Sequence, residues 1–164
     1  TSRGADVLAE LLGSGSTADA HHITAPSPGG IGAIRCMEMA LNDADLIPSD
    51  IVQINAHGTS TPLNDAAEAQ AISRVFGESK PYVTATKGVT GHSLGAAGAL
   101  EAVAVILSIL NKTIPKTHGT TEIDPEFSDL NLVYSDSIPW SPGPTLSNSF
   151  GFGGHNGSIV IGPA

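Results

Sequence analysis

Residues 87–110 decide the fold of this chain, and they read KGVTGHSLGAAG followed by ALEAVAVILSIL. From residue 94 onward this segment is rich in alanine, glycine and aliphatic side chains, and its one charged residue is Glu101. A carboxylate inside lipid hydrocarbon is costly, so a bilayer is a poor environment for the segment. We therefore predict a long helix over residues 91–110 that is buried in protein and does not span a membrane.

The residues before this segment alternate between strand and helix patterns. Apolar positions between residues 31 and 41 recur at spacings of three and four, which predicts an amphipathic helix that ends near residues 42–45. Asp65, with Glu68 three residues later, predicts the cap of a second helix. A helical face at Val7, Leu8, Leu11 and Leu12 competes with the first of the predicted strands. Strands are predicted over residues 7–20, 51–55 and 82–85.

After Pro115 the pattern changes to short strands joined by turns rich in proline, glycine, asparagine and serine. These strands are predicted over residues 131–134, 145–149 and 158–161. Alternating strands and helices followed by consecutive strands indicate an α/β fold, with a mixed parallel and antiparallel sheet packed with helices. No internal repeat or low-complexity linker divides the sequence, so we expect residues 1–164 to form one domain.

Composition excludes several classes of function. Seven Lys and Arg against 16 Asp and Glu give a formal net charge of −9, which argues against non-specific binding of nucleic acid or of anionic membranes. Cys36 is the only cysteine, so the chain has no internal disulfide framework and no multi-cysteine metal site. This cysteine usage fits a reducing compartment, and we expect a cytoplasmic protein. The opening residues TSRG lack the pattern of a signal peptide. We expect the sequence to begin inside a larger protein.

Three polar, glycine-rich segments lie at the ends of predicted elements, where α/β proteins assemble their sites. His57 directly follows a predicted buried strand, which suits a hydrogen-bond donor or a proton-transfer group. Free amides at a helix start favour negative charge near His92 and keep a nearby imidazole neutral. Glu101 lies among apolar residues, so its carboxylate needs a charged partner, which Lys87 or a bound cation could supply. The segments are NAHGTSTP at residues 55–62, KGVTGHSLGAAG at residues 87–98 and SNSFGFGGHN at residues 147–156.

The third segment places Phe150 and Phe152 between glycines, which weaken a strand unless backbone must come close to something. Its functional interpretation is a tight turn that exposes an amide behind an aromatic gate. Each segment also has a purely structural interpretation. His57 then satisfies loop carbonyls, the glycines near residue 95 pack helices, and the Phe-Gly turn only joins two strands.

Taken together, the three segments resemble the C-terminal half of the β-ketoacyl-[acyl-carrier-protein] synthases, condensing enzymes with the thiolase fold. Order, spacing and flanking residues agree over essentially the whole chain, and the ending His155-Asn156 is most similar to actinobacterial elongating members. The resemblance implies a decarboxylative Claisen condensation of malonyl-carrier protein with a cysteine-bound fatty acyl group, in fatty-acid or polyketide synthesis. It implies no required cofactor, because phosphopantetheine enters as the arm of the carrier protein.

The resemblance also implies the site residues. His57 and His92 match the two histidines of a Cys-His-His site, and Lys87 matches the active-site lysine. Phe152 matches the gatekeeper whose amide joins that of the nucleophile in an oxyanion hole. Further residues expected to support the site are Glu101, Phe150 and Asp65. Thr59 and Thr61 match the hydroxyls that bind phosphopantetheine. Some members hold K⁺ or Na⁺ at positions that match Asn55, Glu101, Ser147 and Asn148.

The chain departs from the family at the nucleophile. Cys36 lies on the predicted helix over residues 31–41, at no motif position, so core packing is its expected role. We therefore expect a C-terminal half that is inactive alone and lacks the N-terminal half with the nucleophilic cysteine. The expected partners are that N-terminal half, acyl and malonyl carrier protein, and a second copy in a homodimeric complete enzyme.

Two other functions remain open from the sequence. The first is a non-catalytic pairing or length-determining subunit that kept the fold and lost the chemistry. The second is an α/β-hydrolase, because GHSLG at residues 91–95 matches the G-x-S-x-G elbow with Ser93 as nucleophile. Asp136 and His155 would complete its triad. The elbow requires a serine directly after a strand, whereas seven residues separate Ala85 from Ser93.

Overall fold

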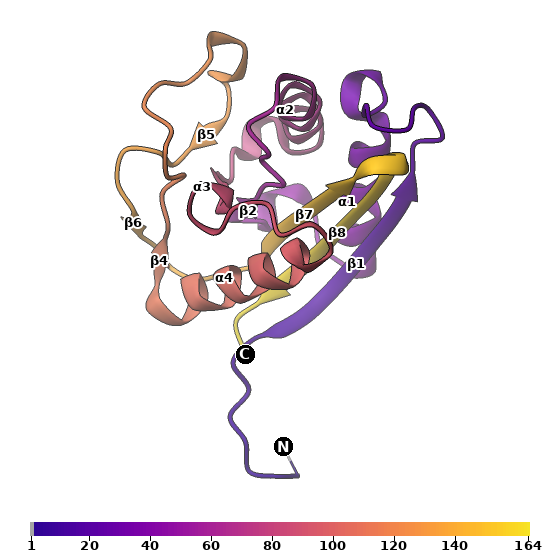
Figure 1. Cartoon of the computed structure of the whole chain (residues 1–164). Helices are drawn as coiled ribbons and strands as arrows, with labels where there is room; N and C mark the ends of the chain where they lie inside the picture. The colour runs from indigo at the N-terminus through magenta and orange to yellow at the C-terminus, as the bar shows by residue number, and fades with distance from the viewer. Residues whose placement is uncertain (1) are drawn as a thin grey trace.

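A six-stranded mixed sheet forms the centre of the computed structural model, which describes residues 2–164 (Figure 1). Its strands are β1 (Glu10–Ala18), β2 (Gln53–Asn55), β3 (Tyr82–Thr84), β5 (Asn131–Leu132), β7 (Thr145–Gly151) and β8 (His155–Gly162). They lie in the order β1-β8-β7-β2-β3-β5. The pairs β2–β3, β2–β7 and β3–β5 are parallel, whereas β8 is antiparallel to both β1 and β7. A separate ribbon pairs β4 (Thr113–Ile114) with β6 (Ile138–Pro139).

Helices cover both faces of this sheet. They are α1 (Ile31–Asp43), α2 (Pro62–Phe76), the short α3 (Lys87–Thr90) and α4 (Ala97–Asn111). Figure 1 shows α1 and α2 together on one side and α4 on the other. Because side chains alternate along a strand, β8 contributes to both layers: Val160 packs into the core with α1 and α2, whereas Ile159 and Ile161 pack with α4.

The predicted mixed α/β fold is confirmed. The segment around residues 10–18 is a strand and not the competing helix, and α1 covers the predicted amphipathic helix. Cys36 is fully buried in α1, where its thiol lies 3.2 Å from the carbonyl oxygen of Gly15. Burial raises the pKa of this thiol, so Cys36 packs the core and is a poor nucleophile.

Two predicted helix starts are wrong. The long helix begins at Ala97 and not at residue 91, because Gly91 and Leu94 have φ angles of 70° and 52° that no α-helix contains. The second helix begins at Pro62 after Thr61, since the ring of proline is already set for a first helical position. Asp65 therefore lies in the first turn of α2 and does not cap it.

β1 lies unusually close to α1. A methyl group added at Gly15 would come within 2.1 Å of the carbonyl oxygen of Cys36, and one at Gly13 within 2.6 Å of that of Ala40. Real carbon atoms do not approach so closely, so only glycine fits at these two positions. The two glycines thus allow a strand and a helix to touch backbone to backbone.

One face of α4 is covered by β7 and β8, and the other is bare. The exposed fractions on the bare face are 44% at Leu100, 53% at Val103, 52% at Leu107 and 48% at Leu110. By length and mean hydropathy alone, the segment Leu94–Asn111 also meets the requirements for crossing a membrane. One side of α4 packs on the sheet, and its Glu101 forms a buried ion pair with Lys87. The helix is therefore buried on that side only, and the prediction of a helix fully buried in protein is wrong for this chain. We define Leu100, Val103, Leu107 and Leu110 as the bare face of α4.

Candidate active site

His57 is held by its backbone at the end of a buried strand. It follows β2 by two residues, and only 4% of it is exposed. Its amide donates a 2.9 Å hydrogen bond to Oε1 of Glu68 on α2, and the amide of Gly58 donates a 2.9 Å bond to Oε2 of the same carboxylate. One buried carboxylate therefore fixes the turn that carries the histidine.

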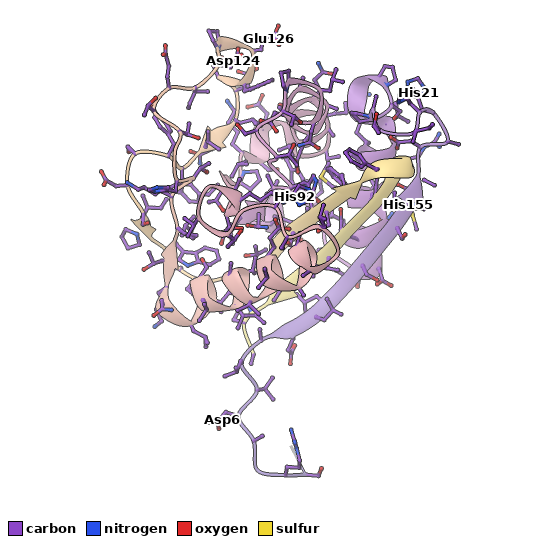
Figure 2. The ribbon with its side chains drawn as sticks, viewed as in Figure 1. Asp6, His21, His92, Asp124, Glu126 and His155 are labelled. Carbon is purple, nitrogen blue, oxygen red and sulfur yellow. The ribbon has the colours of Figure 1, made fainter. Side chains whose placement is uncertain are left out.

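His92 and Lys87 approach His57 from the α3 segment. The ring centroids of the two histidines lie 5.3 Å apart with their planes near perpendicular. Nζ of Lys87 lies 3.2 Å from Nδ1 of His57 and also donates to the carbonyl oxygen of His57. Lys87 forms a buried ion pair with Glu101 of α4, so the predicted partner of Glu101 is the lysine. Figure 2 shows His92 in the middle of the molecule, above α4.

The hydrogen bonds assign the same tautomer to both histidines. Nδ1 of His92 accepts from the amide of Leu94 at 3.2 Å, and Nδ1 of His57 faces the ammonium group of Lys87. An Nδ1 atom that accepts carries no proton, so the proton of each neutral ring resides on Nε2. Both side chains thereby offer an Nε2–H donor, one from each of two loops.

Charge and burial keep His57 neutral. Burial, the Lys87 ammonium and His92 lower the pKa of His57 to about 3. Burial also raises the pKa values of Glu101 and Glu68, while hydrogen bonds from Lys87 and Ser149 oppose the rise at Glu101. His57 and Glu101 are thus buried, whereas His92 is exposed, so an N–H donor is worth more than in water on the His57 side of the site.

The Phe-Gly turn begins beside His57. The ring centroid of Phe150, at the end of β7, lies 6.0 Å from that of His57. Phe152 follows in a turn where Gly153 and Gly154 have φ angles of 80° and 75°, and 76% of Phe152 is exposed. The amide of Gly153 donates to the carbonyl oxygen of Ile23, so the turn rests on the loop after β1.

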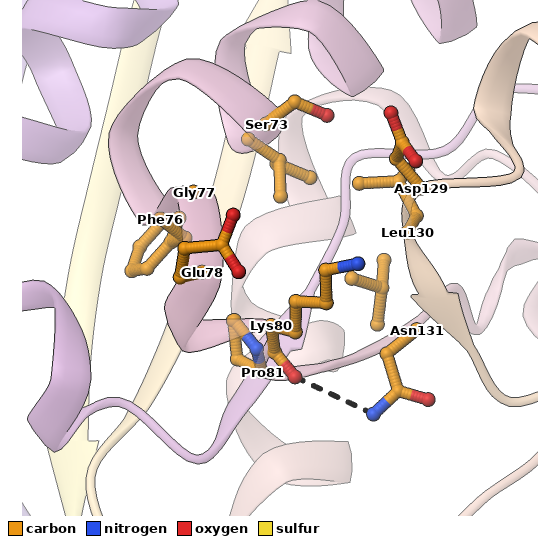
Figure 3. Close-up of a pocket in the computed structure, with 11 residues that line it drawn as sticks. Ser73, Phe76, Gly77, Glu78, Lys80, Pro81, Asp129, Leu130 and Asn131 are labelled. Atoms are coloured by element: carbon orange, nitrogen blue, oxygen red, sulfur yellow. Dashed lines mark hydrogen bonds between the residues drawn. The ribbon is translucent and has the colours of Figure 1, made fainter.

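Thr59 and Thr61 lie beside the site with their hydroxyl oxygens 2.8 Å apart. Asp65 is placed differently: its carboxylate accepts a hydrogen bond from Asn64, and its charge raises the pKa of Glu68. A cavity of about 460 Å³ between α2 and the loop over residues 117–132 is lined by Thr61 and Asp65. A smaller one of about 200 Å³ lies at the far end of α2 around Lys80 and Asn131 (Figure 3). Neither cavity contains the two histidines.

Comparisons with known proteins assign the chain to a family. The family model of the β-ketoacyl synthase C-terminal domain matches residues 8–121. The chain belongs to this family. It is 45% identical over 161 residues to 3-oxoacyl-[acyl-carrier-protein] synthase 2 of Staphylococcus aureus, and 45% identical to the enzyme of the same name from Coxiella burnetii.

Solved structures of β-ketoacyl synthases agree with this assignment. A β-ketoacyl synthase from Burkholderia phymatum superposes with a TM-score of 0.94 at 37% identity over 99% of this chain and 39% of its own. The ishigamide ketosynthase/chain length factor gives 0.94 at 39% identity, over 99% of this chain and 40% of its own. Each of these two alignments spans 97% of this chain, but only 40% of the Staphylococcus aureus enzyme and 39% of the Coxiella burnetii enzyme. It thus spans about two fifths of a β-ketoacyl synthase, and the predicted resemblance is confirmed. The hydrolase interpretation is wrong, because α3 lies between β3 and Ser93 where an elbow would be.

The cation site expected from the family stays a prediction, and the side chains at its positions have partners within the protein. Ser147 faces Asn55, whose amide donates to its hydroxyl at 3.3 Å, whereas the adjacent Asn148 faces Glu68 on the α1 and α2 side. Glu101 is already paired with Lys87. The side chain of Asn148 therefore points away from those of Asn55, Ser147 and Glu101.

Glu68 is the residue at this β-ketoacyl synthase site that sequence reasoning assigned wrongly. It was expected to complete a helix cap with Asp65, but its side chain points inward and holds the backbone of His57 and Gly58. A signal was available in its spacing. Glu68 precedes Ile72 by four residues, which places a carboxylate on the buried face of α2.

Proposed function

We propose that this chain is the C-terminal half of a 3-oxoacyl-[acyl-carrier-protein] synthase and supplies the decarboxylation site of the complete enzyme. The substrate of that site is a malonyl thioester on a carrier protein. The acceptor is a fatty acyl group bound as a thioester to a cysteine outside residues 1–164. No cofactor is required, and the pathway is fatty-acid or polyketide synthesis.

The observation that carries the proposal is the pair of Nε2–H donors on His57 and His92. When the malonyl carboxylate leaves as CO₂, the electrons of the broken C–C bond move onto the thioester oxygen. Two neutral donors stabilise this enolate without protonating its carbon. The carbanion then attacks the acyl carbonyl, and the cysteine thiolate leaves when the tetrahedral intermediate collapses. We assign the oxyanion of this second step to the amide of Phe152.

In this proposal the other site residues position His57 or control the entry of the substrates. Lys87, anchored by Glu101, holds Nδ1 of His57 without a proton. The hydroxyls of Thr59 and Thr61 receive the phosphopantetheine arm, and Phe150 and Phe152 gate the acyl side. A type II polyketide ketosynthase solved with its acyl-carrier protein matches this chain with a TM-score of 0.94, which supports a carrier protein as partner. The complete enzyme is proposed to be a cytoplasmic homodimer.

The test reassembles the enzyme. Residues 1–164 are produced together with the N-terminal half of the Staphylococcus aureus relative, and two reactions are measured separately: release of labelled CO₂ and formation of the acyl-enzyme. His57→Ala and His92→Ala should each slow CO₂ release by about 10²- to 10³-fold, because each removes one donor at a developing oxyanion. Acyl-enzyme formation should persist in part. If His92→Ala stops acylation as fully as decarboxylation, His92 acts instead as a base for the cysteine.

A pairing or chain-length subunit is the second candidate. A structure of a ketosynthase with its chain length factor from Xenorhabdus doucetiae matches this chain at 41% identity with a TM-score of 0.89. The intact set of His57, His92 and Lys87 favours the catalytic half over this candidate. The same reassembly discriminates the two, because a pairing subunit would form the complex and release no CO₂.

A further inference from the structure

β7 presents two different polar environments on its two sides. Ser147 and Ser149 point to the side of α4, where Ser149 lies 3.5 Å from Oε2 of Glu101. Asn148 points to the opposite side, into the layer of α1 and α2. Alternation of side chains along a strand makes this division unavoidable. Asn148 therefore belongs to a different part of the site from its neighbours.

On that side a chain of buried hydrogen bonds runs from β8 to the His57 loop. The hydroxyl of Ser158 donates to Oδ1 of Asn148 at 2.8 Å, and Nδ2 of Asn148 donates to Oε1 of Glu68 at 3.1 Å. Glu68 then accepts the amides of His57 and Gly58. The exposed fractions are 1% for Ser158, 0% for Asn148 and 4% for Glu68. We call Ser158, Asn148 and Glu68 the Glu68 relay.

The relay satisfies a carboxylate that is almost fully buried. Oε1 of Glu68 has two N–H donors, from Asn148 and from His57, and Oε2 has the amide of Gly58. A buried anion that loses a donor becomes costly, and it then shifts or takes up a proton. Either response would loosen its hold on the His57 turn, where Gly58 has a φ of 47°.

We propose that Asn148 is a positioning residue that acts through Glu68 on the backbone of His57, and that it is not a ligand of a monovalent cation. Its oxygen is engaged by Ser158 and its nitrogen by Glu68, so both ends of the amide are used inside the protein. The orientation of the amide is thus fixed from both sides, and Glu68 is fixed with it. The effect on decarboxylation rests on the function proposed above, whereas the structural effect does not.

The test follows the amides of the His57 turn by hydrogen–deuterium exchange in the 164-residue chain. Asn148→Asp keeps the shape but replaces the donor to Glu68 with an oxygen. Exchange in peptides that cover residues 56–60 should become about tenfold faster or more. Without the Asn148 donor, the hydrogen bonds from His57 and Gly58 to Glu68 are weaker, so the turn opens at a lower free-energy cost. Ser158→Ala removes only the hydroxyl and should give a smaller increase in the same peptides. It keeps the test decisive if Asn148→Asp does not fold.

Ser149→Ala is the matched control, since it removes one hydroxyl from the same strand on the opposite side. It should leave exchange of residues 56–60 unchanged. Peptides from β1 should keep their wild-type exchange in all three variants, which separates a local effect from general destabilisation. The proposal is overturned if Asn148→Asp and Ser158→Ala leave residues 56–60 as protected as in the wild type, or if the β1 peptides accelerate equally.

Cations provide the second arm of the test. The differences in the melting temperature of the chain between KCl, NaCl and N-methylglucamine chloride, at equal ionic strength, should be the same in the wild type and in Asn148→Asp. A stabilisation specific to K⁺ or Na⁺ that Asn148→Asp abolishes would assign Asn148 to a cation site and overturn the proposal. Neither arm measures catalysis, so a failure of the proposed function, seen as absent CO₂ release, is distinguishable from a failure of this inference.

Discussion

The fold keeps His57 uncharged, and this lowers the free energy of unfolding at low pH. Burial comes first among the causes that lower its pKa to about 3, and Lys87 and His92 add positive charge nearby. In the unfolded chain an imidazole binds a proton near pH 6.5. The unfolded state therefore takes up a proton that the folded state refuses between these two pH values.

The stability contribution of His57 is thus fully present above pH 6.5 and is lost as the pH falls toward 3. Between pH 7 and pH 4.5, the free energy of unfolding of the wild type should fall by about 2 kcal/mol more than that of His57→Gln, which has no proton to take up. Urea denaturation at the two pH values measures the difference. Equal losses in the two proteins would contradict a neutral buried His57.

The identity of the site residues was more predictable than their connections. The segments around residues 57, 92 and 152 could be recognised in the sequence, because each is rich in glycine and polar residues and lies next to an apolar run. The contact between Asn148 and Glu68 joins residues 80 positions apart, and nothing local to either one reveals it. The opposite directions of Ser147 and Asn148, in contrast, follow from the alternation of side chains along the strand predicted over residues 145–149.

At the scale of elements, the contact between β1 and α1 depends on the absence of side chains. Gly15→Ala should lower the free energy of unfolding by about 3 kcal/mol or more, because its new methyl group would meet the backbone of Cys36, which cannot move aside. Gly95→Ala is the control. Nothing lies within 4 Å of a methyl group at that position, and its backbone has an ordinary φ. Chemical denaturation compares the two, and a tolerant Gly15→Ala would show that β1 and α1 can separate.

Elements were predictable where periodicity decides them, and their ends were not. α1 repeats apolar residues at helical spacing, and α4 is apolar over most of its length, so both were expected. The start of α4 depends on Gly91 and Leu94, whose left-handed backbone places His92 in a turn. Leucine rarely adopts that conformation, so local propensity favoured a continuous helix where the site needs a turn.

At the scale of the whole molecule, the bare face of α4 should make the isolated chain associate. Contiguous exposed apolar surface drives association in water. Sedimentation velocity of residues 1–164 should show species larger than a monomer, and Val103→Lys with Leu107→Lys should shift the chain toward monomer. The same pair should prevent reassembly with the N-terminal half. A compact wild-type monomer that binds no apolar dye would mean that this face is not an interface.

Docking of an acidic carrier protein should depend little on this chain. α4 rises about 1.5 Å per residue, so Lys112 lies about 20 Å from the end of the helix nearest His92, and Arg74 is similarly distant from Thr61 along α2. Charge reversal in the complete enzyme should weaken carrier binding at no more than two of six positions, measured by fluorescence anisotropy. Three or more sensitive positions would place the docking surface here. The six are Arg3, Arg35, Arg74, Lys80, Lys112 and Lys116.

The pairing of β1 with β8 brings the two ends of the domain together. Glu10 pairs with Gly162, and Figure 1 shows the C-terminus beside the start of β1. Paired residues in an antiparallel ladder lie only about 5 Å apart, so a few residues would join them. A circular permutant opened at the exposed turn near Gly119 would keep every strand pairing of the sheet. The first and the last strand of the sheet therefore meet at one edge, so the order of the strands along the chain can be changed without rethreading the sheet.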